Sequence, residues 1–125
     1  MSSSWENVKV DNSNMRAYVS APENAQRVPA IVVVQGQTGV DDFVEFSDMV
    51  ARQGFVAAAP DLYHRDPPDC KDDAPTRRMR LRDTTVIRDI NTTVSFLKSH
   101  KSVDPGKIGI VGFCMGGRIV ISCRR

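Results

Sequence analysis

The sequence predicts an α/β protein with a mostly parallel sheet and helices on both faces. Three short apolar runs, each rich in β-branched residues or alanine, are typical of strands buried on both faces; they are 30–36 (AIVVVQG), 55–63 (FVAAAPDLY) and 107–113 (KIGIVGF). Segments with apolar residues at helical spacing separate these runs. Strand–helix–strand alternation of this kind forms right-handed βαβ units, in which the strands run parallel.

The first part of the chain predicts a hairpin and then the first buried strand. Residues 5–20 alternate between polar and apolar side chains, and the polar stretch 11–14 (DNSN) supplies the turn. A polar, proline-bounded loop, APENAQRVP, leads from the hairpin to the strand at 30–36. That strand ends in glycine, which is a typical stop signal.

Two helices are predicted between and after the first two buried strands. The helix at 41–54 carries an apolar face and ends at a glycine; the face consists of Phe43, Phe46, Met49 and Val50. The proline-rich, charged segment 64–78 is predicted to be a loop. A longer amphipathic helix follows at 81–100, and the SVDPG stretch after it predicts a turn before the third buried strand.

Composition excludes several classes of function. The chain has 125 residues, 41% of them hydrophobic and 26% charged, which is ordinary for one small globular domain. Its 17 basic and 15 acidic residues are interspersed and give a net charge of +2, so nucleic acid and anionic membranes are not expected partners. No signal peptide or spanning segment is visible, which predicts a cytoplasmic protein.

The three cysteines do not form a recognisable disulfide or metal pattern. Cys70, Cys114 and Cys123 are an odd number without CxxC or histidine-rich spacing. We therefore predict no metal and no cofactor.

The stretch GFCMGG, at the junction of the last strand with a following helix, carries the clearest chemical signal. Gly112, Cys114 and Gly116 form the G-x-C-x-G pattern of an α/β-hydrolase nucleophile elbow, with cysteine in place of the commoner serine. The nucleophile sits on a sharp turn, where side chains two residues before or after it would collide with neighbouring backbone. A helix N-terminus favours both a thiolate and a developing oxyanion. A buried structural cysteine in a glycine turn is the alternative; P-loop and dinucleotide fingerprints are absent.

The longer motifs resemble the dienelactone hydrolase family. The resemblance rests on VPAIVVVQGQTGV, ARQGFVAAAPDLYHR and KIGIVGFCMGGR, and it covers about residues 28–120. It implies an α/β-hydrolase fold that cleaves an ester or lactone through a cysteine nucleophile and an acyl-enzyme. It also implies a small-molecule ester or lactone as the partner.

The resemblance carries individual roles onto this chain. Cys114 is implied as the nucleophile, and the backbone N–H groups of Met115 and Gln37 as the oxyanion-hole donors. Gly36 stands where members that open dienelactones usually have glutamate, so a broader ester or lactone substrate is favoured. The family places an arginine before the long helix to hold a substrate carboxylate, and Arg78, between Arg77 and Arg80, lies near that place.

Other polar residues are predicted to have structural roles. His64 is expected to be a surface loop residue, His100 a partner of a helix C-terminus, and Asp61 a residue that shapes the end of its strand.

The acid and histidine of a catalytic triad should follow the nucleophile in this fold, and nothing follows Arg125 in this sequence. We therefore expect residues 1–125 to be an incomplete, amino-terminal part of an α/β-hydrolase domain that is inactive alone. The alternative is a non-catalytic fragment or interaction module that retains the sheet.

Overall fold

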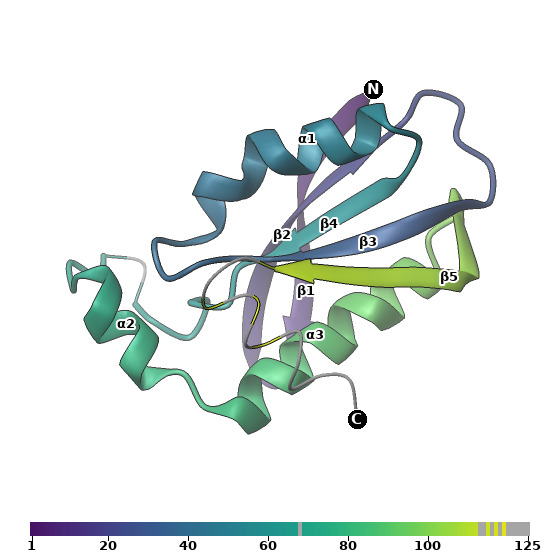
Figure 1. Cartoon of the computed structure of the whole chain (residues 1–125). Coiled ribbons are helices and arrows are strands. Elements are labelled where there is room, and N and C mark those ends of the chain that lie inside the picture. The colour runs from purple at the N-terminus through teal and green to yellow at the C-terminus, as the bar shows by residue number, and fades with distance from the viewer. Residues whose placement is uncertain (68, 113–114, 116, 118, 120–125) are drawn as a thin grey trace.

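The computed structural model describes residues 1–67, 69–112, 115, 117 and 119. A five-stranded sheet lies at the centre of the molecule, with helices above and below it (Figure 1). Its strands are β1 (Ser2–Val10), β2 (Ser13–Ala21), β3 (Val28–Val34), β4 (Val56–Pro60) and β5 (Val103–Gly112). The helices are a 3₁₀ turn η1 (Val40–Phe43), α1 (Val44–Arg52), α2 (Ala74–Arg80) and α3 (Asp83–Lys98).

The strand order is β1-β2-β4-β3-β5. β3 pairs in parallel with both β4 and β5, while the β1–β2 hairpin joins the sheet through an antiparallel pairing of β2 with β4. The predicted adjacency of the three buried strands is therefore confirmed, and so is the α/β fold. The hairpin adds two antiparallel strands to that parallel centre.

The two faces of the sheet are covered by different helices. α1 packs on one face, where Val33, Ala57 and Ala59 form a buried cluster with Val40 and Tyr18. α3 packs on the other face through its apolar stripe, which comprises Val86, Ile90 and Leu97. β3 and β4 contribute buried side chains to both clusters, which explains their continuous apolar sequences.

Several predicted boundaries differ from the observed ones. β3 ends at Val34 and β4 at Pro60, so residues 35–36 and 61–63 lie beyond the strands. The predicted helix at 41–54 is a 3₁₀ turn followed by α1, and the helix at 81–100 is α3, which spans 83–98.

Two predictions about loops were wrong. The segment at 64–78 is not only a loop, because α2 begins at Ala74, capped by the Asp73 side chain, which accepts a hydrogen bond from the Thr76 N–H (3.0 Å). The SVDPG stretch is not a separate turn, because β5 begins at Val103. The register between β3 and β5 shifts there: Val28 pairs with Val103 but Ala30 with Ile108, so the extra residues of β5 bulge.

Among the described residues, no helix is long and apolar enough to cross a membrane.

Candidate active site

Several residues with predicted chemical roles lie near the ends of β3, β4 and β5. These three strands are parallel, so their carboxyl ends lie at the same end of the sheet, here called the carboxyl end. Gly112 pairs with Val34, and Gly36 follows Val34 by two residues. Asp61 follows Pro60, the last residue of β4. The sequence predicts that Gly36, Asp61 and Cys114 group at one end of the sheet. Gly36 and Asp61 lie there, near Gly112, whereas Cys114 lies outside the described residues.

Part of the predicted elbow lies outside the described residues. This applies to Cys114 and Gly116, whereas Gly112 ends β5 and Met115 has helical backbone with a side chain only 8% exposed. The backbone is strand at Gly112 and helical at Met115, and the two residues between them lie outside the described residues.

The loop after β3 closes into a tight turn around Gln37. The Gly39 N–H donates to the Gly36 carbonyl oxygen (3.2 Å), and Gly39 has φ 113° and ψ 170°, a conformation that is essentially restricted to glycine. No described group accepts a hydrogen bond from the Gln37 N–H. Gln37 therefore has a backbone donor available at the carboxyl end of the sheet.

Gln35 connects this loop to the turn after β4. Its fully buried side chain accepts a hydrogen bond from the Leu62 N–H at Oε1 (2.8 Å) and donates from Nε2 to the Gly36 carbonyl (3.3 Å). The Leu62 N–H can only donate, so the oxygen of the Gln35 side-chain amide must face it. The NH₂ of the same amide then faces Gly36. The sequence motif identified the loop but gave no sign of this connection.

The turn after β4 makes a second contact with the loop after β3. The Tyr63 hydroxyl donates to the Gln37 carbonyl oxygen (2.7 Å), and the Tyr63 N–H donates to Asp61 Oδ1 (3.0 Å). Asp61 therefore shapes the end of its strand, as predicted. Burial raises the pKa of the Tyr63 hydroxyl, so this group remains a neutral donor at physiological pH.

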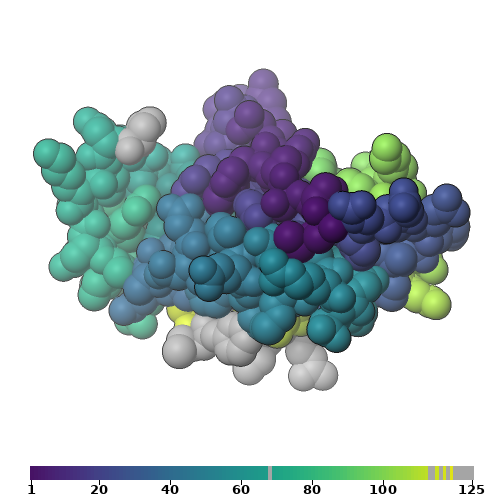
Figure 2. Space-filling view, turned by 90° about the horizontal axis from the view of Figure 1, so that it is seen from above, coloured from purple at the N-terminus to yellow at the C-terminus, as the bar shows by residue number. Residues whose placement is uncertain are grey.

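α2 lies beside the carboxyl end of the sheet and presents three arginines. Figure 2 shows the segment containing α2 at the left end of the molecule. Arg77 donates to Asp66 (2.8 Å) and stacks over the Tyr63 ring, with its Cζ 4.5 Å from the ring centroid. Arg80 pairs with Asp66 (3.2 Å) and Asp72 (2.6 Å). Arg78 is exposed and forms no ion pair with any described residue; it lines a small cavity that Met115 also lines.

His64 is not the surface residue that its loop position suggested. Its side chain is 1% exposed, with Nδ1 2.7 Å from Ser13 Oγ and Nε2 3.1 Å from Asp89 Oδ2. Arg65, the next residue, makes a bidentate ion pair with the same Asp89 carboxylate (2.9 Å for each bond). His64 thus belongs to a buried contact between the hairpin and α3.

His100 does not act on a helix carbonyl in the contacts observed; its Nδ1 accepts a hydrogen bond from the Ser102 N–H (3.1 Å).

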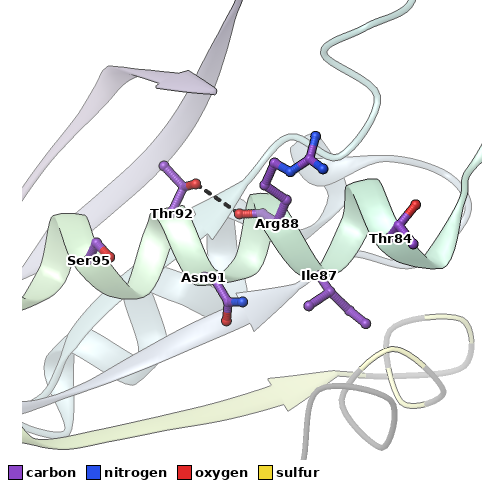
Figure 3. Close-up of a pocket in the computed structure, with 6 residues that line it drawn as sticks. All are labelled: Thr84, Ile87, Arg88, Asn91, Thr92 and Ser95. Atoms are coloured by element: carbon purple, nitrogen blue, oxygen red, sulfur yellow. Dashed lines mark hydrogen bonds between the residues drawn. The ribbon is translucent and has the colours of Figure 1, made fainter. Parts of the chain in front are cut away.

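A shallow depression on the outer face of α3 contains none of the predicted site residues. Figure 3 shows its lining, in which the Thr92 hydroxyl donates to the Arg88 carbonyl (2.8 Å) within the helix; the lining comprises Thr84, Ile87, Arg88, Asn91, Thr92 and Ser95. Within the described part of the chain, no group of three or more His, Cys, Asp or Glu side chains is arranged to hold a metal ion.

Comparisons with known proteins agree with this geometry. The family pattern described as "Dienelactone hydrolase family" matches residues 15–125. A Synechocystis protein named "Putative carboxymethylenebutenolidase" is 28% identical and aligns with 90% of this chain. The "Carboxymethylenebutenolidase" of Pseudomonas putida is 29% identical and aligns with 87% of it. The chain spans about half the length of these curated relatives, 50% of each.

A solved structure extends the similarity to three dimensions. The crystal structure of a "Putative Dienelactone Hydrolase" from Klebsiella pneumoniae subsp. pneumoniae MGH 78578 is 31% identical and superimposes with a TM-score of 0.84. The match covers 94% of this chain and 51% of that protein. The α/β-hydrolase fold is thereby shown for this chain.

Proposed function

Because the chain belongs to the dienelactone hydrolase family, we propose that it carries the nucleophile and the oxyanion hole of a hydrolase that cleaves esters or lactones through Cys114. Three features near the carboxyl end of the sheet support this proposal. Gly112 ends β5 beside Val34, the backbone at Met115 is helical, and the Gln37 N–H has no acceptor among the described groups. In an oxyanion hole, the hydrogen-bond donors must point toward the position that the developing oxyanion occupies.

The proposed first step is acylation of the cysteine. The Cys114 thiolate attacks the carbonyl carbon of the ester, and the carbonyl oxygen takes the negative charge of the tetrahedral intermediate. The N–H groups of Gln37 and Met115 donate to that oxygen. The C–O bond to the leaving group then breaks, which yields a thioester on Cys114 and an alkoxide that takes a proton from solvent.

The second step requires a base that removes a proton from water. Water must lose a proton to attack the thioester, and in this fold a histidine after the nucleophile normally accepts it. Both histidines of this chain precede the elbow, and His64 is buried against Ser13 and Asp89. We therefore infer that residues 1–125 form the acyl-enzyme but do not turn over.

The proposed substrate is a general ester or lactone that carries a carboxylate. Gly36 contributes no carboxylate next to the nucleophile, unlike the glutamate of dienelactone-opening members, which favours a broader substrate range. Arg78 is a candidate partner for a substrate carboxylate, because Arg77 and Arg80 already pair with Asp66. A bidentate contact from a guanidinium suits a planar carboxylate.

An activated-ester assay tests the proposal. Purified residues 1–125 are mixed with p-nitrophenyl acetate, and we expect a burst of about one equivalent of p-nitrophenol without sustained turnover. Mass spectrometry should find the acetyl group on the peptide that contains Cys114, and the burst at that site should disappear in Cys114→Ala. Separate quantification of the Cys70 peptide accounts for background acylation of that free thiol.

Two results would contradict the proposal in different ways. Sustained turnover that depends on Cys114 would mean that this sequence already contains a base for deacylation. Absence of Cys114 acylation would remove the nucleophile and favour the alternative, a non-catalytic module that retains the sheet.

A further inference from the structure

The peptide units on both sides of Gln37 are held by hydrogen bonds. The peptide unit before it contains the Gly36 carbonyl, which receives hydrogen bonds from Gln35 Nε2 (3.3 Å) and the Gly39 N–H (3.2 Å). The peptide unit after it contains the Gln37 carbonyl, which receives the Tyr63 hydroxyl (2.7 Å). Fixing both peptide planes fixes both backbone dihedral angles of Gln37.

The direction of the Gln37 N–H follows from these contacts. The N–H shares a planar trans peptide with the Gly36 carbonyl, so it points away from the two groups that bind that oxygen. The two hydrogen bonds to the Gly36 carbonyl come from Gly39 in the loop and from the neighbouring Gln35. The hydrogen bond to the Gln37 carbonyl comes from Tyr63, in the turn after β4. Tyr63 is therefore the contact that fixes the Gln37 carbonyl itself relative to a second strand.

Tyr63 is itself held firmly. Its ring is 4% exposed and lies under the Arg77 guanidinium, which in turn binds Asp66. The hydroxyl is 26 residues away from Gln37 along the chain, so only the fold brings the two together.

We propose that Tyr63 is a positioning residue for the oxyanion hole, acting through the Gln37 carbonyl to aim the Gln37 N–H at the oxyanion that forms during acylation. This inference rests on the proposed function and adds a residue to it. Tyr63 touches neither substrate nor nucleophile in this role. Its effect should therefore appear only in reactions that build negative charge on a carbonyl oxygen.

Two reactions of Cys114 separate positioning from a general structural effect. Acetylation by p-nitrophenyl acetate passes through an oxyanion and depends on the donors. Alkylation by iodoacetamide displaces iodide from a CH₂ group and forms no oxyanion, so it reports only the accessibility and thiolate character of Cys114. Both rates are measured on the Cys114 peptide of the same protein by mass spectrometry.

The test variant is Tyr63→Phe, which removes one oxygen and keeps the ring beneath Arg77. Loss of a complete oxyanion donor typically slows a reaction by about 10²–10³-fold, so misaligning one should slow acetylation by about tenfold. The alkylation rate should remain within about twofold of wild type, because the thiolate is unchanged.

Tyr18→Phe is the matched control. Tyr18 is also buried, and its hydroxyl donates to Asp48 (2.8 Å) on the face covered by α1. This variant loses a buried tyrosine hydrogen bond that does not involve Gln37, so both rates should stay near wild type.

The outcomes distinguish this inference from the proposed function. The positioning role would be overturned if Tyr63→Phe slowed the acetylation and alkylation rates equally, or if it slowed neither rate. If the wild-type chain shows alkylation but no acetylation of Cys114, the proposed function itself fails, and the role of Tyr63 fails with it.

Discussion

Gly39 shows at the scale of one residue how the loop after β3 depends on backbone freedom. Its φ of 113° and ψ of 170° place it where side chains are strained, although a Cβ there would meet no atom within 4 Å. The N–H held in this conformation closes the turn onto the Gly36 carbonyl. The geometry around Gln37 therefore requires glycine for conformational rather than packing reasons.

We predict that Gly39→Ala lowers the free energy of unfolding by about 2 kcal/mol through backbone strain. Gly109→Ala is the control, because a Cβ at Gly109 also meets no atom within 4 Å and Gly109 has no positive φ. That substitution should be neutral or slightly stabilising. Urea unfolding of both variants measures the difference; equal effects would contradict an origin in the backbone of Gly39.

The sequence predicted which residues belong to the candidate site, but not the hydrogen bonds that hold the surrounding loops in place. The family resemblance assigned roles to Gln37 and Gly36, and the G-x-C-x-G spacing assigned one to Gly112; parallel pairing brings the ends of their strands together. The supporting contacts join different loops: Gln35 contacts Leu62, and Tyr63 contacts Gln37. No local sequence pattern predicts contacts of this kind. The burial of His64 was missed for the same reason, since its neighbours Ser13 and Asp89 come from distant segments.

At the scale of elements, apolar periodicity identified the elements that form the core and missed the one that does not. β3, β4 and α3 were predicted because their apolar residues repeat with a strand or helix pattern. α2 has no buried residue and therefore no apolar stripe. A cap followed by proline, Asp73 and Pro75, was its available signal.

The stability that the α2 ion pairs contribute is expected to depend on pH through Asp66. Burial opposes ionisation of this carboxyl, but hydrogen bonds from Arg77 and Arg80 prevail and hold its pKa below the ordinary value of 3.8. A group with a lowered pKa in the folded state stabilises the fold above its unfolded pKa. That stabilisation is lost as the pH falls below 3.8 and through the folded pKa.

We therefore predict that Asp66→Asn is less stable than wild type at pH 6 and that the difference shrinks as the pH falls below 3.8. Unfolding free energies measured between these conditions test the sign. The pH-dependent difference should vanish when both Arg77 and Arg80 are replaced by Met, and Arg78→Met should leave it intact because Arg78 does not pair with Asp66. A difference independent of pH would mean that the ion pairs are not its source.

At the scale of the whole molecule, a network of charges joins the hairpin to the parallel sheet and α3. Arg65, in the turn after β4, pairs with the buried Asp89 of α3 and with Asp11 at the tip of the hairpin (3.2 Å). Arg88 of α3 binds the same Asp11 carboxylate (3.0 Å). The alternation of strands and helices predicted the α/β class, but it carries no information about such contacts between distant turns.

The Asp89 carboxylate is the costly member of this network, because its side chain is completely buried. Removing Arg65 would leave that charge beside His64 without its bidentate partner. Breaking a buried ion pair from one side typically costs about 3–5 kcal/mol, whereas removing both charges costs much less.

We predict that Arg65→Met lowers the free energy of unfolding by about 3 kcal/mol, and that Arg65→Met/Asp89→Asn recovers most of this loss because no unpaired charge remains. Urea unfolding of the two single variants and the double variant gives the coupling between the sites. Arg88→Met is the control; Arg88 pairs with the exposed Asp11 carboxylate, so its loss should change stability far less. Strictly additive losses at positions 65 and 89 would show that the ion pair does not join the hairpin, sheet and helix as described.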